Sequence, residues 1–286
     1  MVEATTTRVE QSAAKPRPKR GPKGYSLRTL PGFTFVALFT MIVLYSPISI
    51  LVIFSFNEGD SLAIWEGFSL QWYAKAAANE QVQEAAIRSL YLAFIASSIG
   101  TIAATMAALA TTRTRRIPGK TMIYALINQP LMVPEIVTAV ALLIVFAAIK
   151  VATGHNSMIY LIVAHTAFCI PFAYLPIRAR LETMDNSLEP AARDLYASAW
   201  QTFRMVPLPN MWPGIIAGMM LSFVISLDTV VITEFVKSAG QDTLPTYMLG
   251  QLRRVVTPEV NAISTVILFS GAILVALFFR LTQRKG

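Results

Sequence analysis

Three carboxylates lie inside or beside long apolar stretches of the chain: Glu135, Asp228 and Glu234. An ionised carboxylate at the centre of a membrane costs roughly 2.5–3.5 kcal/mol on insertion scales, so such a residue normally faces a cavity or a partner. Spaced acids would compensate the charge of a cationic solute, and nearby aromatic rings would add cation–π contacts. We predict that the three acids line a substrate pathway. The alternative is that they cap broken helices or lie at the membrane interface.

Two other groups of residues resemble chemical sites only in part. His165 and Cys169 are four residues apart on one helix face, but no third ligand or orienting acid is near them in sequence, which favours core packing over a metal or nucleophile site. Gly119, Lys120 and Thr121 match the end of a phosphate-binding loop, but Thr114 stands where its first glycine belongs. We therefore predict no metal, cofactor or ATP site in this chain, and no enzymatic activity of its own.

The composition is that of a membrane protein. Of 286 residues, 55% are hydrophobic and only 14% are charged, whereas soluble domains carry about 25% charged residues. The net charge of +8 arises from bases placed beside apolar runs rather than along one soluble face, so it indicates topology rather than nucleic-acid binding. Cys169 is the only cysteine, so no disulfide forms within the chain.

Six stretches are apolar for about the 20 residues that a membrane-spanning helix needs. The predicted spans are 33–56, 90–111, 122–148, 158–177, 212–236 and 262–281. Pro130 and Pro134 in the third span, and Pro171 and Pro176 in the fourth, should kink or break their helices. The fold class is an all-α integral membrane domain covering residues 31–286.

The distribution of bases predicts the orientation. Lys and Arg gather after the second span, after the fourth span and at the C-terminus, whereas the first outer loop is acidic. Bases mark the cytoplasmic side, so both termini are expected there. Residues 1–30 are polar and basic and should form a disordered cytoplasmic tail. Such a tail would bind anionic lipid with about 1 kcal/mol per basic residue near the surface.

The loop between the fourth and fifth spans, residues 180–211, is polar but patterned. Its apolar side chains recur at helical spacing, namely Leu188, Ala192, Leu195, Ala199 and Phe203. This spacing predicts an amphipathic cytoplasmic helix, and its single apolar stripe needs a partner.

This loop resembles the signature of permeases of binding-protein-dependent ABC importers: Glu-Ala-Ala, three residues, Gly, nine residues, Ile, one residue, Leu-Pro. Ala191, Ala192, Val206, Leu208 and Pro209 are in register. Two positions depart, because Pro190 replaces the Glu and Tyr196 replaces the Gly, while Glu189 lies one residue early. The resemblance implies a type I importer permease fold and a coupling helix that docks on an ATPase subunit.

In the family, the Gly lets the chain turn between two short helices. Since Tyr196 disfavours a left-handed turn, we expect a more continuous helix here, with Tyr196 filling the ATPase groove by bulk; a weakened or unusual motor partner is the alternative. The residues expected to couple to the ATPase are Glu189, Ala191, Ala192, Leu195, Tyr196, Phe203, Leu208 and Pro209.

The resemblance covers most of residues 40–275 and is closest to permeases of the spermidine and putrescine type. The matching segments are 54–57, 68–73, 134–135, 226–228, 230–232, 235–236, 244–245 and 257–265. The subfamily usually repeats the acid of Asp228, but Thr229 follows here.

The resemblance implies a bacterial inner-membrane complex with a second permease, identical or homologous, two ATP-binding subunits and a periplasmic solute-binding protein. The rival substrates are an opine, an amino-acid derivative or a metal complex. A channel or membrane enzyme that works without ATP is a further alternative.

The outer segment 237–261 is the candidate contact for the binding protein. It contains an amphipathic stretch around 247–255, and Arg253 and Arg254 would pair with acidic residues of that protein. The alternative is a simple cover over the helix ends with solvated charges.

Overall fold

The computed structural model describes residues 32–62, 64–114, 118–155, 157–253 and 257–283, without the side chains of 277–279 and 281–283. The predicted tail 1–30 and Arg254 lie outside the described residues. Within them the chain is helical, with a single isolated bridge between Asn57 and Phe68. Six helices are long and apolar enough to cross a membrane, which confirms the prediction of an all-α protein with six spans. They are α1 (Phe33–Phe54), α3 (Glu80–Arg113), α5 (Glu135–Thr153), α6 (Ile159–Glu182), α9 (Pro207–Asp228) and α12 (Pro258–Gln283).

The chain divides into two compact units, Met1–Ile50 and Leu51–Gly286. The described part of the first unit consists of most of α1. This helix is apolar on every side, and none of its residues is buried. A helix that is hydrophobic all round suits a lipid environment rather than a water-exposed surface.

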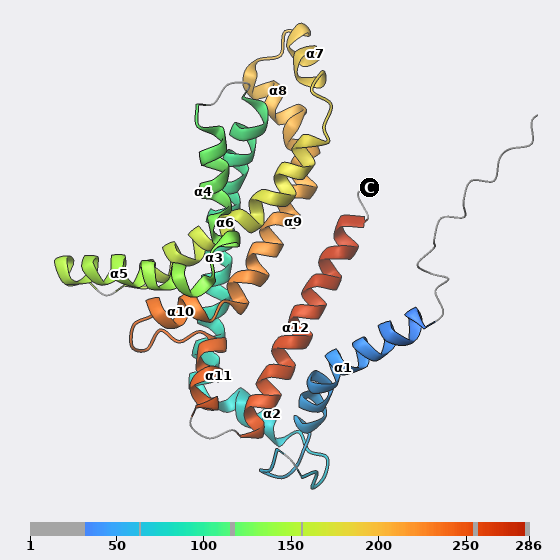
Figure 1. Ribbon diagram of the computed structural model, residues 1–286, viewed down its shortest axis with the longest axis vertical. Helices are drawn as coiled ribbons and strands as arrows, with labels where there is room; N and C mark the ends of the chain where they lie inside the picture. The colour runs from blue at the N-terminus through green and yellow to red at the C-terminus, as the bar shows by residue number, and fades with distance from the viewer. Residues whose placement is uncertain (1–31, 63, 115–117, 156, 254–256, 284–286) are drawn as a thin grey trace, which may run out of the picture. The chain divides into compact units, whose positions relative to one another are not determined.

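The core of the second unit is a bundle of α3, α6 and α9, which pack side by side (Figure 1). The buried face of α3 carries mostly Ala, Ser, Gly and Thr side chains. A Cβ atom added to Gly218 of α9 would lie 2.7 Å from the carbonyl oxygen of Ala173 in α6. Small residues of this kind allow the close backbone approach on which helix packing in membranes depends.

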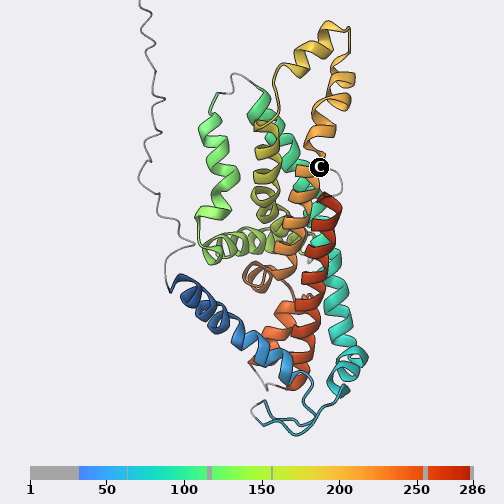
Figure 2. The same cartoon turned by 90° about the vertical axis from the view of Figure 1, so that its right-hand side faces the viewer.

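The third predicted span is two helices rather than one. Helix α4 (Lys120–Met132) ends at Val133, which is extended, and Pro134 precedes α5. The ring of a proline disfavours a helical conformation in the residue before it, so Val133 and Pro134 break the helix completely. Helix α5 runs across the direction of α4 (Figures 1 and 2).

The fifth predicted span also ends early. Helix α9 stops at Asp228, Thr229 is extended, and the chain resumes as the short helix α10 (Val231–Val236). Helix α10 packs against α5 and α6, with Ile232 and Val236 in the same apolar cluster as Phe146. The prediction that one span runs on to residue 236 is therefore wrong, since the last six residues form a separate buried helix.

Shorter helices lie at opposite ends of the α3–α6–α9 bundle (Figures 1 and 2). At one end are α7 (Leu188–Asp194) and α8 (Ala199–Met205). At the other end are α2 (Gln71–Ala78) and α11 (Leu244–Leu252), where α2 contacts α12 and α11 contacts α3.

Candidate functional site

Asp228 stands at the break between α9 and α10. Its side chain is exposed, and no hydrogen bond or ion pair reaches its carboxylate from any residue that the structure describes. It also occupies the C-terminus of α9, where the helix dipole disfavours a negative charge by about 0.3–1 kcal/mol. The carboxylate borders a cavity of about 410 Å³ whose other lining residues are mainly apolar side chains of α11 and α12. Among the residues that the structure describes, this carboxylate has no counter-ion, and it lies beside an open cavity.

Glu135 lies at the other helix break and reaches α10. It is the first residue of α5, and its Oε1 accepts a hydrogen bond of 3.4 Å from the backbone N–H of Ile232, in the first turn of α10. Lys150, near the end of α5, donates to the carbonyl oxygen of Val236 at 3.4 Å and to Ser238 Oγ at 3.0 Å. Helix α5 therefore places an acid at the positive end of α10 and a base at its negative end, which is the favourable arrangement for a helix dipole. Glu135 therefore caps a helix, which is the role that the alternative interpretation gave to these acids.

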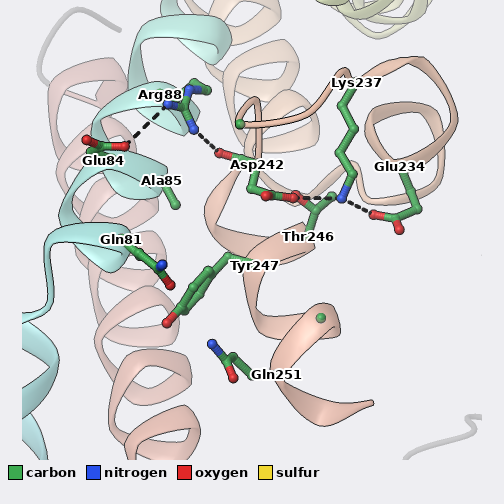
Figure 3. Close-up of a pocket in the computed structure, with 12 residues that line it drawn as sticks. Gln81, Glu84, Ala85, Arg88, Glu234, Lys237, Asp242, Thr246, Tyr247 and Gln251 are labelled. Atoms are coloured by element: carbon green, nitrogen blue, oxygen red, sulfur yellow. Dashed lines mark hydrogen bonds and ion pairs between the residues drawn. The ribbon is translucent and has the colours of Figure 1, made fainter. Parts of the chain in front are cut away.

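Glu234 belongs to an ionic network on the side of α10 (Figure 3). Lys237 Nζ lies 2.6 Å from Glu234 Oε2 and 2.7 Å from Asp242 Oδ1. Arg253 Nη1 lies 3.7 Å from Glu234 Oε1, and Arg88 Nη1 donates to the backbone carbonyl of Asp242 at 2.8 Å. The network borders a cavity of about 440 Å³.

The charges of this network hold Lys237 in its ionised form. Burial disfavours the ammonium, but hydrogen bonds to Asp242 and Glu234 outweigh burial and raise the pKa of Lys237 above its usual value. Sequence reasoning missed Lys237 and Asp242 because residues five apart do not share a helix face. A turn at Gly240, whose φ is 77°, brings them together, and this glycine within a polar segment was the available signal.

The three predicted pathway acids thus occupy different surroundings. Glu135 and Glu234 both contact or belong to α10, and Asp228 precedes it by three residues, but no contact joins the three carboxylates among the described residues. Of the three, only Asp228 is exposed, and the other two are half-buried. Their role in a pathway stays a prediction.

The coupling loop, residues 180–211, contains two short helices rather than the continuous helix expected. Tyr196 adopts a left-handed conformation with φ of 63° between α7 and α8. The N–H of Tyr196 bonds the Arg193 carbonyl at 2.9 Å, and the N–H of Ala197 bonds the Ala192 carbonyl at 3.2 Å, which is the Schellman pattern of a helix end. Ser198 and Gln201 then form a capping box that starts α8. These end and start signals outweigh the cost of about 1–2 kcal/mol for a left-handed residue with a Cβ.

The coupling loop presents bulky apolar side chains to its surroundings. Tyr196 is 98% exposed and Leu195 is 82% exposed. Trp200 and Met205 are exposed as well. The predicted apolar stripe did not include either residue, although it included Ala199 and Phe203 of the same helix α8. Phe203 is half-buried, and its ring lies 5.6 Å from that of Trp200. An apolar surface of this kind is typical of a docking site for another protein.

The remaining predicted coupling residues form the attachment of this loop. Glu189 pairs with Arg113 of α3 at 3.0 Å. Ala192 is half-buried and Ala191 exposed. Leu208 and Pro209 lie in the first turn of α9, so they connect the loop to the bundle.

Arg253, the predicted contact for a binding protein, follows α11, and its side chain is 65% exposed. His165 and Cys169 are both buried. Among the described residues, no three His, Cys, Asp or Glu side chains are grouped so that they could hold a metal ion.

Comparison with known proteins agrees with this architecture. Residues 96–284 match the model of the family described as "Binding-protein-dependent transport system inner membrane component". The putrescine transport system permease protein PotI of Escherichia coli K12 is 36% identical over 242 residues, which are 84% of this chain and 83% of that protein. The spermidine/putrescine transport system permease protein PotC of Haemophilus influenzae is 37% identical over 243 residues, 85% of this chain and 93% of that protein.

The fold agrees with a solved structure as well. A bacterial ABC transporter involved in the import of alginate has a chain that superimposes with a TM-score of 0.70 at 13% identity, over 88% of this chain and 95% of that one. This confirms the importer permease fold. The chain belongs to the family of binding-protein-dependent transport system inner membrane components.

Proposed function

We propose that this permease translocates a polyamine, such as putrescine or spermidine, and that Asp228 receives an ammonium group of the solute. The observation that carries the proposal is the exposed carboxylate of Asp228, which stands at a helix break beside an open cavity without a counter-ion among the described residues. A cationic solute would supply the missing positive charge. The relatives named for putrescine and spermidine transport support the same substrate class.

The complex that we propose contains a second permease, two ATP-binding subunits and a periplasmic binding protein. The exposed Leu195, Tyr196 and Trp200 of the coupling loop offer an apolar surface for an ATP-binding subunit. Arg253, at the opposite end of the bundle, offers a charge for the binding protein. The bases near α7 and α8 support an orientation in which that end faces the cytoplasm and both chain termini lie inside. The membrane in this proposal is the bacterial inner membrane.

Uptake by the reconstituted complex tests the substrate. Proteoliposomes that contain this chain, its partners and ATP should accumulate labelled putrescine or spermidine, and Asp228→Asn should reduce uptake about tenfold through the loss of one charge contact. Asp60→Asn, in the exposed first outer loop, is the matched control. Uptake of only an opine, an amino-acid derivative or a metal complex from the same panel would overturn the polyamine assignment.

A further inference from the structure

His165 joins three helices at the break that carries Asp228. It lies on α6 and is 1% exposed. Its Nδ1 lies 2.9 Å from Ser226 Oγ in α9, and its Nε2 lies 2.9 Å from Thr233 Oγ1 in α10. The imidazole therefore connects the last turn of α9 to the middle of α10, on either side of the two residues that interrupt them.

The hydrogen-bond directions assign the tautomer of the ring. Thr233 Oγ1 donates its only proton to the carbonyl oxygen of Thr229 at 2.9 Å, because a carbonyl oxygen accepts only. Thr233 Oγ1 must then accept from His165 Nε2–H, which leaves Nδ1 to accept the hydroxyl proton of Ser226. A neutral imidazole with one donor and one acceptor fits this chain of bonds. An aliphatic side chain in its place would leave the hydroxyls of Ser226 and Thr233 without this hydrogen-bond partner.

The break is held by these bonds together with those that Glu135 and Lys150 make to the two ends of α10. The Thr229 carbonyl is satisfied through Thr233, and Thr229 Oγ1 bonds back to the Ile225 carbonyl at 2.7 Å. The carboxylate of Asp228 has no bond of its own among the described residues. Its position is therefore set by the backbone on either side, which is the part of the chain that His165 holds through Ser226 and Thr233.

We propose that His165 is a positioning residue for Asp228, and that it sets the affinity of the permease for its cationic solute without touching that solute. The proposal rests on the proposed function of Asp228. It assigns the ring two separate tasks: Nδ1 fixes the end of α9, and Nε2 fixes α10. Loss of either task should move the carboxylate relative to the cavity that it borders.

Three substitutions separate the two tasks. In His165→Asn the side-chain amide lies near the position of Nδ1, and in His165→Gln it lies near the position of Nε2. His165→Phe keeps an aromatic ring but has neither polar atom. His155→Phe, at the exposed second histidine, is the matched control. In proteoliposomes, His165→Phe should raise the half-saturating putrescine concentration about tenfold with a smaller change in maximal rate, and the Asn and Gln variants should fall between.

Two results would refute the positioning role. One is a His165→Phe complex whose half-saturating concentration equals that of the wild type. The other is a double variant, His165→Phe with Asp228→Asn, whose loss of uptake equals the product of the two single losses. A residue that acts through Asp228 should add little to the loss once the carboxylate is gone. If His165→Phe does not assemble, Ser226→Ala and Thr233→Val remove the same bonds from the other side.

A second measurement is independent of the transported solute. In an Asp228→Cys variant, a cationic thiol reagent should modify residue 228, while Cys169 is buried. Adding His165→Phe should change the labelling rate several-fold if His165 positions residue 228. An unchanged rate would overturn the proposal, whereas failure of the wild type to take up any polyamine would refute the proposed substrate alone.

Discussion

Arg113 Nε lies 3.0 Å from Glu189 Oε1, and this ion pair joins the last turn of α3 to the first turn of α7. Both side chains are largely shielded, at 18% and 20% exposure. Arg113 also bonds Asn186 Oδ1 and, through Nη2, the Leu181 carbonyl at 3.3 Å. The start of the coupling loop is thus attached to a helix of the central bundle, so a displacement of α7 by a docked partner would act directly on α3.

The first prediction concerns this attachment. Glu189→Gln keeps the shape of the side chain but removes its charge, leaving Arg113 without its acid. The reconstituted complex should hydrolyse more ATP per solute transported, because motion of α7 reaches α3 less completely. Asp194→Asn, at the exposed end of the same helix, should not change this ratio. Equal ratios for the two variants would show that the pair carries no coupling.

A second prediction concerns the left-handed Tyr196. Glycine adopts φ of 63° without a Cβ clash, so Tyr196→Gly should stabilise the turn by about 1 kcal/mol. The same change removes a ring that is 98% exposed, and ATPase coupling should fall if that ring fills a groove on the partner. Hydrogen exchange of α7 measures the first effect and solute-stimulated ATP hydrolysis the second. Unchanged ATPase coupling in Tyr196→Gly would refute the proposal that the ring fills a groove on the partner.

The sequence predicted the spans and the break at Pro134, but it missed the interruptions at Asp228 and Tyr196, for physical reasons that differ between the two sites. Hydropathy identifies apolar length, so α3, α6 and α12 were found with shifted ends. Hydropathy does not register a break inside an apolar run, and the end of α9 at Asp228 depends on contacts of α10 with α5 and α6. At Tyr196 the residue type pointed the wrong way, because the Schellman bonds and the Ser198 capping box decide the turn.

A third prediction tests the packing of α6 on α9. Gly218→Ala should destabilise the permease, because the added Cβ would lie 2.7 Å from the backbone oxygen of Ala173, which cannot move as a flexible side chain can. We expect a cost of about 1–3 kcal/mol, as for other overpacked sites. Gly271→Ala is the control, since its added Cβ would meet no described atom within 4 Å apart from its chain neighbours and its own helix backbone. Thermal unfolding in detergent should separate the two variants, and equal midpoints would contradict the close contact.

The last prediction concerns the ionic network at Lys237, whose pKa is raised above its usual value by Asp242 and Glu234. A base with a raised pKa in the folded state contributes stability below its unfolded pKa of about 10.4, and this stability is lost as the pH rises through the folded pKa. Lys237→Met should therefore lower the unfolding temperature near pH 7, where it leaves two carboxylates without their shared ammonium. The difference from the wild type should shrink as the pH rises through the raised pKa of Lys237.

The control for this experiment is Lys75→Met. Lys75 Nζ lies 4.8 Å over the ring of Trp72 and has no carboxylate partner among the described residues. Its removal should cost less at pH 7 than that of Lys237, since no carboxylate loses its counter-ion. If the difference between Lys237→Met and wild type stays constant from neutral to strongly alkaline pH, the stabilisation comes from packing of the lysine stem rather than from its charge.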